Sequence, residues 1–201
     1  MRLPSLLIIA LTLAVTAGRA EALQWRGVKL DPEGALRPQL LADAIRSYET
    51  HDRGDLNGQV AIVDFARPSA ERRLFLLSLA TGHVETYLVS HGQGSDRDHD
   101  GLAEYFSDAT GSHASSLGAF RAARRYEGSH GLSLALDGLD PGNRSARSRA
   151  IVMHSQWYVS DRMAAERGKL GRSWGCFAVD RGVIARLVDT LEDGGFIYAG
   201  R

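Results

Sequence analysis

The sequence has little cysteine and no excess of either charge. A single cysteine among 201 residues excludes an internal disulfide, an iron–sulfur cluster and a multi-thiolate zinc site. The 24 Lys and Arg residues balance 24 Asp and Glu residues, so the basic excess typical of a nucleic-acid-binding surface is missing. With 44% hydrophobic and 24% charged residues, the composition is that of a folded chain. The length therefore favours one globular domain with a sizeable core.

The N-terminus has the three parts of a secretory signal peptide. Arg2 supplies the positive charge, an apolar run covers 6–15, and Ala20-Glu21-Ala22 is a small-residue cleavage site. The run is shorter than the roughly 20 apolar residues that cross a bilayer, and no later stretch is apolar enough to cross one. We therefore expect residues 1–22 to be removed on export, leaving a mature chain without a membrane span.

Hydrophobic spacing divides the mature chain into a helical segment and a mainly β region. Residues 23–58 form an N-terminal helical segment, because apolar side chains from Leu36 to Tyr48 recur near helical spacing. A second helix is expected within 180–193. The strands predicted from alternation and turn residues are 59–65, 72–79, 84–90, 117–123, 133–136, 150–153 and 196–198. The pattern indicates a mainly β (α+β) fold, a sandwich or barrel with attached helices, over residues 59–201.

Cys176 is the first candidate for chemistry. It ends the segment Gly171-Arg172-Ser173-Trp174-Gly175 and lies just before the predicted helix at 180–193. Free backbone N–H groups at such a turn would favour the thiolate, and they could also bind the oxyanion formed on an attacked carbonyl. In an exported protein a lone thiol is buried and inert, paired between chains, or reactive.

His154 is the candidate base for this thiol. It ends the predicted strand at 150–153, and a histidine at a strand end beside a cleft is well placed to accept a proton from a thiol. Ser155 could orient the ring through its backbone or its hydroxyl. The alternative is a surface histidine and a packed cysteine, and spacing alone leaves both interpretations open.

At these residues the sequence resembles the L,D-transpeptidases (YkuD-like catalytic domain) that act on bacterial peptidoglycan. Their pattern is a histidine at a strand end, often followed by Gly or Ser, and then Ser/Thr-His-Gly-Cys. His154-Ser155 matches the first part and Ser173-Trp174-Gly175-Cys176 the second, as in a divergent branch of that family. The segment 115–120 resembles the strand that precedes the catalytic histidine. The resemblance covers about residues 59–199 and implies a YkuD-like β-sandwich or barrel catalytic domain.

This sequence departs from the family pattern at two positions. Trp174 stands where most members have histidine, so a second histidine cannot act from that position. Ala178 stands where Asn or Arg is usual, which puts a substrate or structural contact in doubt. Neither change removes the nucleophile or the base.

The resemblance implies a reaction in which Cys176 is the nucleophile and His154 its base. The thiolate would attack an L,D peptide bond of a peptidoglycan stem peptide, release the terminal D-amino acid and leave a thioacyl-enzyme. An amine acceptor would make a crosslink or exchange the D-amino acid, whereas water would make the protein an L,D-carboxypeptidase. A non-catalytic cell-wall-binding module with a structural cysteine is the remaining alternative. No cofactor is implied, and the location would be the periplasm or cell envelope of a bacterium.

The other candidate residues follow from the same motifs. Backbone N–H groups of Trp174, Gly175 and Cys176 would hold the oxyanion, and Ser173 would support the turn. Arg172 is a candidate for binding a substrate carboxylate, since a guanidinium matches that geometry in two bonds, although a solvated arginine is an equal alternative. The further candidates for substrate binding are His91 and Ser116.

A polar loop carries a partial calcium motif. Asp96, Asp98 and Asp100 occupy positions 1, 3 and 5 of such a loop, with Gly101 at position 6. Position 12 is Ser107 rather than a bidentate glutamate, so a solvated loop is the favoured interpretation. The spacings of the nearby histidines, His91, His99 and His113, match no zinc signature, and no metal is predicted.

Overall fold

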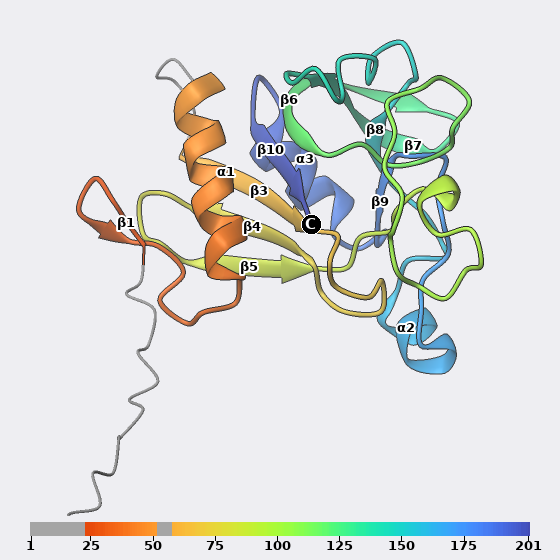
Figure 1. Ribbon diagram of the computed structural model, residues 1–201, viewed down its shortest axis with the longest axis horizontal. Helices are drawn as coiled ribbons and strands as arrows, with labels where there is room; N and C mark the ends of the chain where they lie inside the picture. The colour runs from red at the N-terminus through yellow and green to blue at the C-terminus, as the bar shows by residue number, and fades with distance from the viewer. Residues whose placement is uncertain (1–22, 52–57) are drawn as a thin grey trace, which may run out of the picture.

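The computed structural model describes residues 23–51 and 58–201, so the predicted signal peptide lies outside the described residues. Eight strands form one mixed sheet in the order β5-β4-β3-β10-β6-β7-β8-β9 (Figure 1). The prediction of a mainly β fold with attached helices is confirmed. The strands of this sheet are β3 (Gln59–Asp64), β4 (Leu74–Ser78), β5 (Val84–Tyr87), β6 (Gly118–Gly128), β7 (Gly131–Gly138), β8 (Val152–Ser155), β9 (Phe177–Val179) and β10 (Phe196–Gly200).

The two edges of the sheet meet, so that the sheet curls towards a barrel. Val89, just beyond the edge strand β5, forms an antiparallel bridge to Val179 in β9 at the other edge. Next to this bridge, the Ser90 N–H donates to the carbonyl of Ala178 at 2.9 Å. A closed sheet leaves fewer unpaired strand edges. The closure brings the chain around residues 89–93 against the segment that contains Cys176.

Each face of β3 packs into a different core, which explains why the strand is apolar throughout. Val60 and Ile62 join the core beneath helix α1, whereas Ala61 and Val63 join the core that the curled sheet encloses. A side-chain period of two residues sends alternate positions to opposite faces. The enclosed core is completed by helix α3 (Ile184–Leu191), which packs against β7 and β8.

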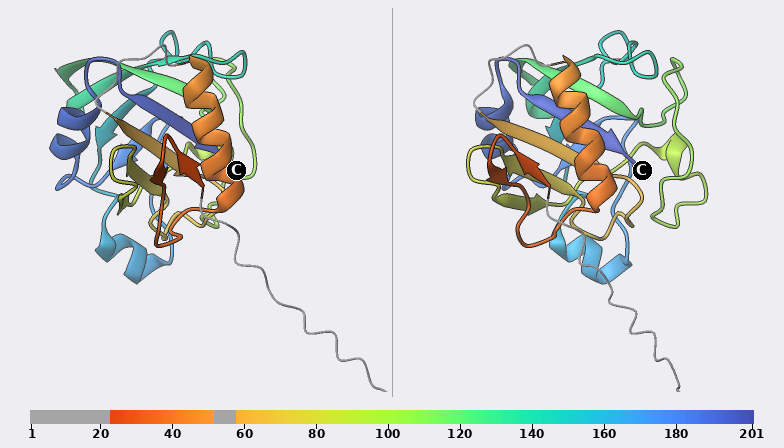
Figure 2. Two further views of the ribbon diagram at one scale, coloured as in Figure 1. Left: turned by 90° about the vertical axis from the view of Figure 1, so that its left-hand side faces the viewer. Right: turned by 60° about the vertical axis from the view of Figure 1, so that its left-hand side comes forward.

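The N-terminal segment lies on the outer face of the sheet. A short hairpin of β1 (Gln24–Trp25) and β2 (Val28–Lys29) precedes α1 (Pro38–His51). The helix covers β3, β6 and β10 (Figure 2). The predicted helix is confirmed, and its buried side chains are Leu40, Leu41, Ala44, Ile45 and Tyr48. The division of the chain at residue 58 stays a prediction.

Two elements near the candidate cysteine differ from the sequence predictions. Helix α2 (Asp161–Arg167) was not predicted; the Ser160 hydroxyl caps its N-terminus by accepting from Met163 N–H. Strand β9 follows Cys176 directly, and α3 begins only at Ile184. The expectation that Cys176 precedes a helix is therefore wrong, because its apolar neighbours 177–179 pair with β8 instead. Within the described residues, no helix is long and apolar enough to cross a membrane.

Candidate active site

A pocket of about 510 Å³ opens beside the end of β8. Cys176 and His154 both line it, together with Ser173 and Trp174 of the motif. Its complete lining is Tyr126, Ser129, His130, Arg149, Ala150, Val152, His154, Gln156, Tyr158, Arg172, Ser173, Trp174 and Cys176. The lining includes two arginines and no Asp or Glu, and Arg149 is paired with Asp108 at 3.5 Å.

The pairing of β8 with β9 brings the segment of Cys176 beside the strand of His154. Strands β8 and β9 are parallel, and His154 pairs with Ala178. Cys176 directly precedes β9, two residues before Ala178, and it lines the same pocket as His154. The sheet itself brings these residues together across 22 positions of sequence.

Cys176 is a neutral thiol in the free protein. Burial raises the pKa of its thiol, and this effect outweighs the opposing influences of the Val152 backbone N–H and the Arg149 guanidinium. Its Sγ lies 3.6 Å from the carbonyl oxygen of Ala150. The expectation of a thiolate favoured at a helix start is therefore corrected, since no helix begins there and desolvation dominates.

His154 is neutral as well. Burial, and secondly the charge on His130, lower the pKa of His154 to about 4, against a smaller opposing contribution from the backbone of Ser155. Its Nδ1 lies 3.2 Å from the carbonyl oxygen of Ser155, which can only accept a hydrogen bond. Nδ1 therefore carries the proton, and Nε2 keeps the lone pair that a base needs. Ser155 contacts the ring through its backbone and not through its hydroxyl.

The turn before Cys176 is held by Ser173. The Ser173 hydroxyl donates to the carbonyl of Cys176 at 2.7 Å and accepts from Gly175 N–H at 3.1 Å. Gly175 has φ +109°, and a Cβ there would lie 2.7 Å from the carbonyl oxygen of Ala114, so the position requires glycine. Because the Gly175 N–H is engaged within the turn, the backbone amides of Trp174 and Cys176 remain as the candidate oxyanion donors.

Arg149 is a pocket residue that the sequence reasoning missed. Its side chain is only 4% exposed, and its guanidinium donates to the Ser107 carbonyl at 2.9 Å, the Ala114 carbonyl at 2.6 Å and the Ser116 hydroxyl at 2.8 Å. These bonds tie the loop at 107–116 to the strand that carries His154. No local motif marks Arg149, because all these partners are more than 30 residues away in sequence.

The structure brings Arg172 to the pocket but leaves His91 and Ser116 outside its lining. Ser116 is buried behind Arg149, and its hydroxyl donates to the Ser107 carbonyl at 3.2 Å. Arg172 donates through Nη1 to the carbonyl of Asp96. That contact fixes one end of its guanidinium beside the pocket.

His91 belongs to a buried polar network behind the motif. Its Nδ1 lies 2.8 Å from Arg73 Nη2, and its Nε2 lies 2.9 Å from an Asp96 carboxylate oxygen. Arginine can only donate, so Nδ1 accepts and Nε2–H donates to Asp96. The His91 carbonyl accepts from Ser173 N–H at 2.9 Å, which connects the network to the motif turn.

Trp174 lines the pocket, and the aspartate loop is joined to the pocket by the contact of Arg172 with the Asp96 carbonyl. Trp174 is 68% exposed, and its ring stacks on His113, with centroids 4.7 Å apart and planes 9° apart.

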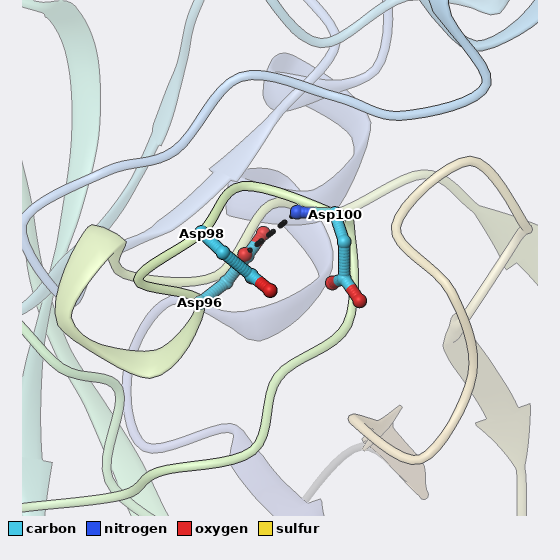
Figure 3. A group of neighbouring side chains, drawn as sticks. All are labelled: Asp96, Asp98 and Asp100. Atoms are coloured by element: carbon cyan, nitrogen blue, oxygen red, sulfur yellow. Dashed lines mark hydrogen bonds between the residues drawn. The ribbon is translucent and has the colours of Figure 1, made fainter.

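Asp96, Asp98 and Asp100 bring one carboxylate oxygen each within 4.8 Å of the others (Figure 3). Backbone N–H groups of Asp100 and Gly101 already donate to the Asp96 carboxylate, each at 3.1 Å, as in a self-contained turn.

The arrangement of a cysteine, a neutral histidine and a glycine-bearing turn in one pocket agrees with the sequence match. Residues 33–199 match the family described as L,D-transpeptidase catalytic domain. The chain belongs to this family. The match confirms the resemblance found at the motifs and begins within the N-terminal segment, before α1 (Pro38–His51).

Solved structures of L,D-transpeptidases are distant from this chain in sequence. The L,D-transpeptidase LdtMt1 in complex with imipenem is 14% identical, with 71% of this chain and 59% of that chain covered and a TM-score of 0.43. An L,D-transpeptidase from Mycobacterium smegmatis is 12% identical, with 72% and 59% covered and a TM-score of 0.42. This chain thus spans less than two thirds of either protein. No curated protein sequence is a significant match.

Proposed function

We propose that this protein is an exported cysteine L,D-transpeptidase that acts on peptidoglycan stem peptides through a thioacyl-enzyme. The observation that carries the proposal is that Cys176, which directly precedes β9, and His154, which lies in the paired strand β8, line one pocket. Membership of the L,D-transpeptidase family supports the reaction class. Arg172 in the lining suits a stem peptide because such peptides carry free carboxylates, whereas the charge of Arg149 is paired with Asp108.

Both reacting side chains begin neutral, so the proton moves as the substrate is attacked. The Cys176 S–H bond breaks, its proton passes to Nε2 of His154, and the sulfur forms a bond to the carbonyl carbon on the L side of an L,D peptide bond. The C–N bond then breaks, and the His154 imidazolium returns the proton to the departing amine of the D-amino acid. This leaves a thioester on Cys176 and a neutral imidazole.

Transfer completes the cycle by the reverse steps. An amine from a second stem peptide gives its proton to Nε2 and attacks the thioester carbon, and the Cys176 sulfur leaves with that proton. The amides of Trp174 and Cys176 would stabilise the negative oxygen in both halves, a contribution of roughly 3 kcal/mol for each donor in comparable sites. Water in place of the amine gives L,D-carboxypeptidase activity.

Intact-mass spectrometry with imipenem tests the proposal. Mature protein is incubated with the drug beside Cys176→Ala, and products from a stem tetrapeptide are analysed with and without an amine acceptor. We expect one drug adduct on the wild type, none on the variant, and a crosslinked or exchanged peptide only with the acceptor. Hydrolysis alone would favour the carboxypeptidase. No adduct, together with slow alkylation of Cys176, would favour a cell-wall-binding module.

Export is the second part of the proposal. The charge, apolar run and Ala20-Glu21-Ala22 site in residues 1–22 support cleavage after Ala22 and a periplasmic or envelope location. Expression in a bacterial host followed by mass analysis of the periplasmic fraction should give a mature chain that begins at Leu23. A full-length cytoplasmic product would contradict it.

A further inference from the structure

His130 lies over the candidate base although it is remote from it in sequence. It sits in the turn between β6 and β7, and its ring stacks on His154 with centroids 4.5 Å apart and planes 27° apart. Both rings line the pocket that contains Cys176. Two histidines in contact beside a nucleophile need a physical explanation, because their charges repel when both are protonated.

The ring of His130 is itself held in place. Its Nδ1 lies 2.9 Å from Nε2 of Gln156, which can only donate, so the neutral ring carries its proton on Nε2. The backbone of Gln156 in turn donates to the Val179 carbonyl at 3.0 Å. His130 is thus fixed to the same strand pair, β8 and β9, that positions His154 and Cys176.

Few other interactions fix the orientation of the His154 ring. Within the described residues its imidazole makes one hydrogen bond, the 3.2 Å contact to the Ser155 carbonyl, which leaves the tilt of the ring to its packing. His130 supplies that packing and, when it is itself protonated, also a charge that opposes protonation of His154. The other titratable groups that line the pocket are Tyr126, Arg149, Tyr158, Arg172 and Cys176. No acidic side chain among the lining residues would reverse this effect.

We propose that His130 is a positioning residue: by stacking on His154 it holds the imidazole with Nε2 towards the pocket. The role rests on the proposed function only in that His154 acts as the base. His130 touches neither the thiol nor a reacting bond, so it acts through His154 alone. Substituting it should therefore change the titration of His154 and the rate of the base-dependent step together.

An NMR titration of the His154 imidazole, assigned with His154→Gln, tests the electrostatic part without any substrate. In His130→Ala we expect His154 to titrate about 1 pH unit higher, since both the cover and the opposing charge are lost. His130→Phe keeps an aromatic cover without charge and should give a smaller increase. His83→Ala, which removes an exposed histidine from a different hairpin turn, is the matched control and should leave the titration unchanged.

The rate of acylation by imipenem tests the positioning part. We expect His130→Ala to be acylated about 10-fold more slowly and His130→Phe to stay within about threefold of the wild type, because a misplaced base loses rate steeply. In a His154→Gln background the same substitution should have no further effect. An unchanged His154 titration or an unchanged acylation rate in His130→Ala would overturn the proposal. Failure of wild-type protein to react with imipenem, with a shifted titration in His130→Ala, would instead count against the proposed function alone.

Discussion

His91 and His154 have similar pKa values, but their rings differ in their hydrogen-bond partners. Burial is the main cause that lowers the pKa of each to about 4, so both are neutral at neutral pH. Both nitrogens of His91 are engaged, one by Arg73 and one by Asp96. Among the residues that the structure describes, His154 has a hydrogen-bond partner only on Nδ1, and its other nitrogen belongs to a ring that lines the pocket.

The comparison shows that a perturbed pKa does not by itself identify a base. Burial depresses the pKa of any histidine, and a structural network produces the same shift as an active site. The distinguishing feature is a ring nitrogen without a fixed partner in a pocket that also contains a thiol. His91 joins two buried charged groups by hydrogen bonds, whereas Nε2 of His154 has no partner within the described residues, as the proposed base requires.

The largest expected effect comes from making the same substitution at both positions. Glutamine offers one acceptor and one donor, as a neutral imidazole does, but it cannot take up a proton. We expect His154→Gln to lower the rate of acylation by imipenem by about 10²–10⁴-fold. His91→Gln can still accept from Arg73 and donate to Asp96, so its loss should be smaller than about 10-fold.

Stopped-flow or time-resolved mass measurements of both variants provide the comparison, with circular dichroism to confirm that each is folded. Equal losses in the two variants would show that the free nitrogen of His154 does not matter. A large loss in His91→Gln alone would place the base in the buried network instead.

Substitution by leucine should have a smaller effect, on the free energy of unfolding, and here the change at His91 should cost more than the change at His154. His91→Leu removes the residue that lies between Arg73 and Asp96, both of which are buried. Each of them loses one hydrogen bond but keeps its bonds to backbone groups, so the expected cost is about 1–3 kcal/mol. Urea denaturation should show this loss in the free energy of unfolding. His154→Leu, at the pocket, should be nearly neutral, and equal losses at both positions would contradict the assignment of His91 to a structural role.

Acid should destabilise the protein through the same residues. An unfolded histidine titrates near pH 6.5 and these two titrate near 4 when folded, so between those values the unfolded state binds more protons. Stability is therefore fully present above about pH 6.5 and is lost as the pH falls towards 4, by up to about 3 kcal/mol for the fully buried His91. Unfolding curves from pH 7 to 4.5 should show the decrease. A flat profile would mean that the pKa of His91 is the same in the folded and the unfolded state.

The sequence predicted the scaffold of the site better than its chemistry. Apolar alternation is enough to locate most strands, and the ordered motifs select His154 and Cys176. The neutral thiol, the engaged amide of Gly175 and the stack of His130 on His154 depend on packing between segments remote in sequence. The short strand β9 was missed because three apolar residues before a helical pattern do not distinguish a strand from a helix start.

The smallest expected effect tests whether the backbone carbonyl or the side-chain hydroxyl of Ser155 holds the His154 ring. The imidazole is held by the Ser155 carbonyl, which is present in every residue type, and the Ser155 hydroxyl makes no hydrogen bond to the ring. We therefore expect Ser155→Ala to change the acylation rate by less than about threefold, which is within the range of a lost exposed contact. The imipenem assay used for His154→Gln gives the measurement, and Ser155→Thr serves as the control that keeps a hydroxyl. A loss of 100-fold in the alanine variant, restored by threonine, would show that the hydroxyl orients the base. The backbone carbonyl would then be insufficient, and His154 would resemble His91 in depending on side-chain partners.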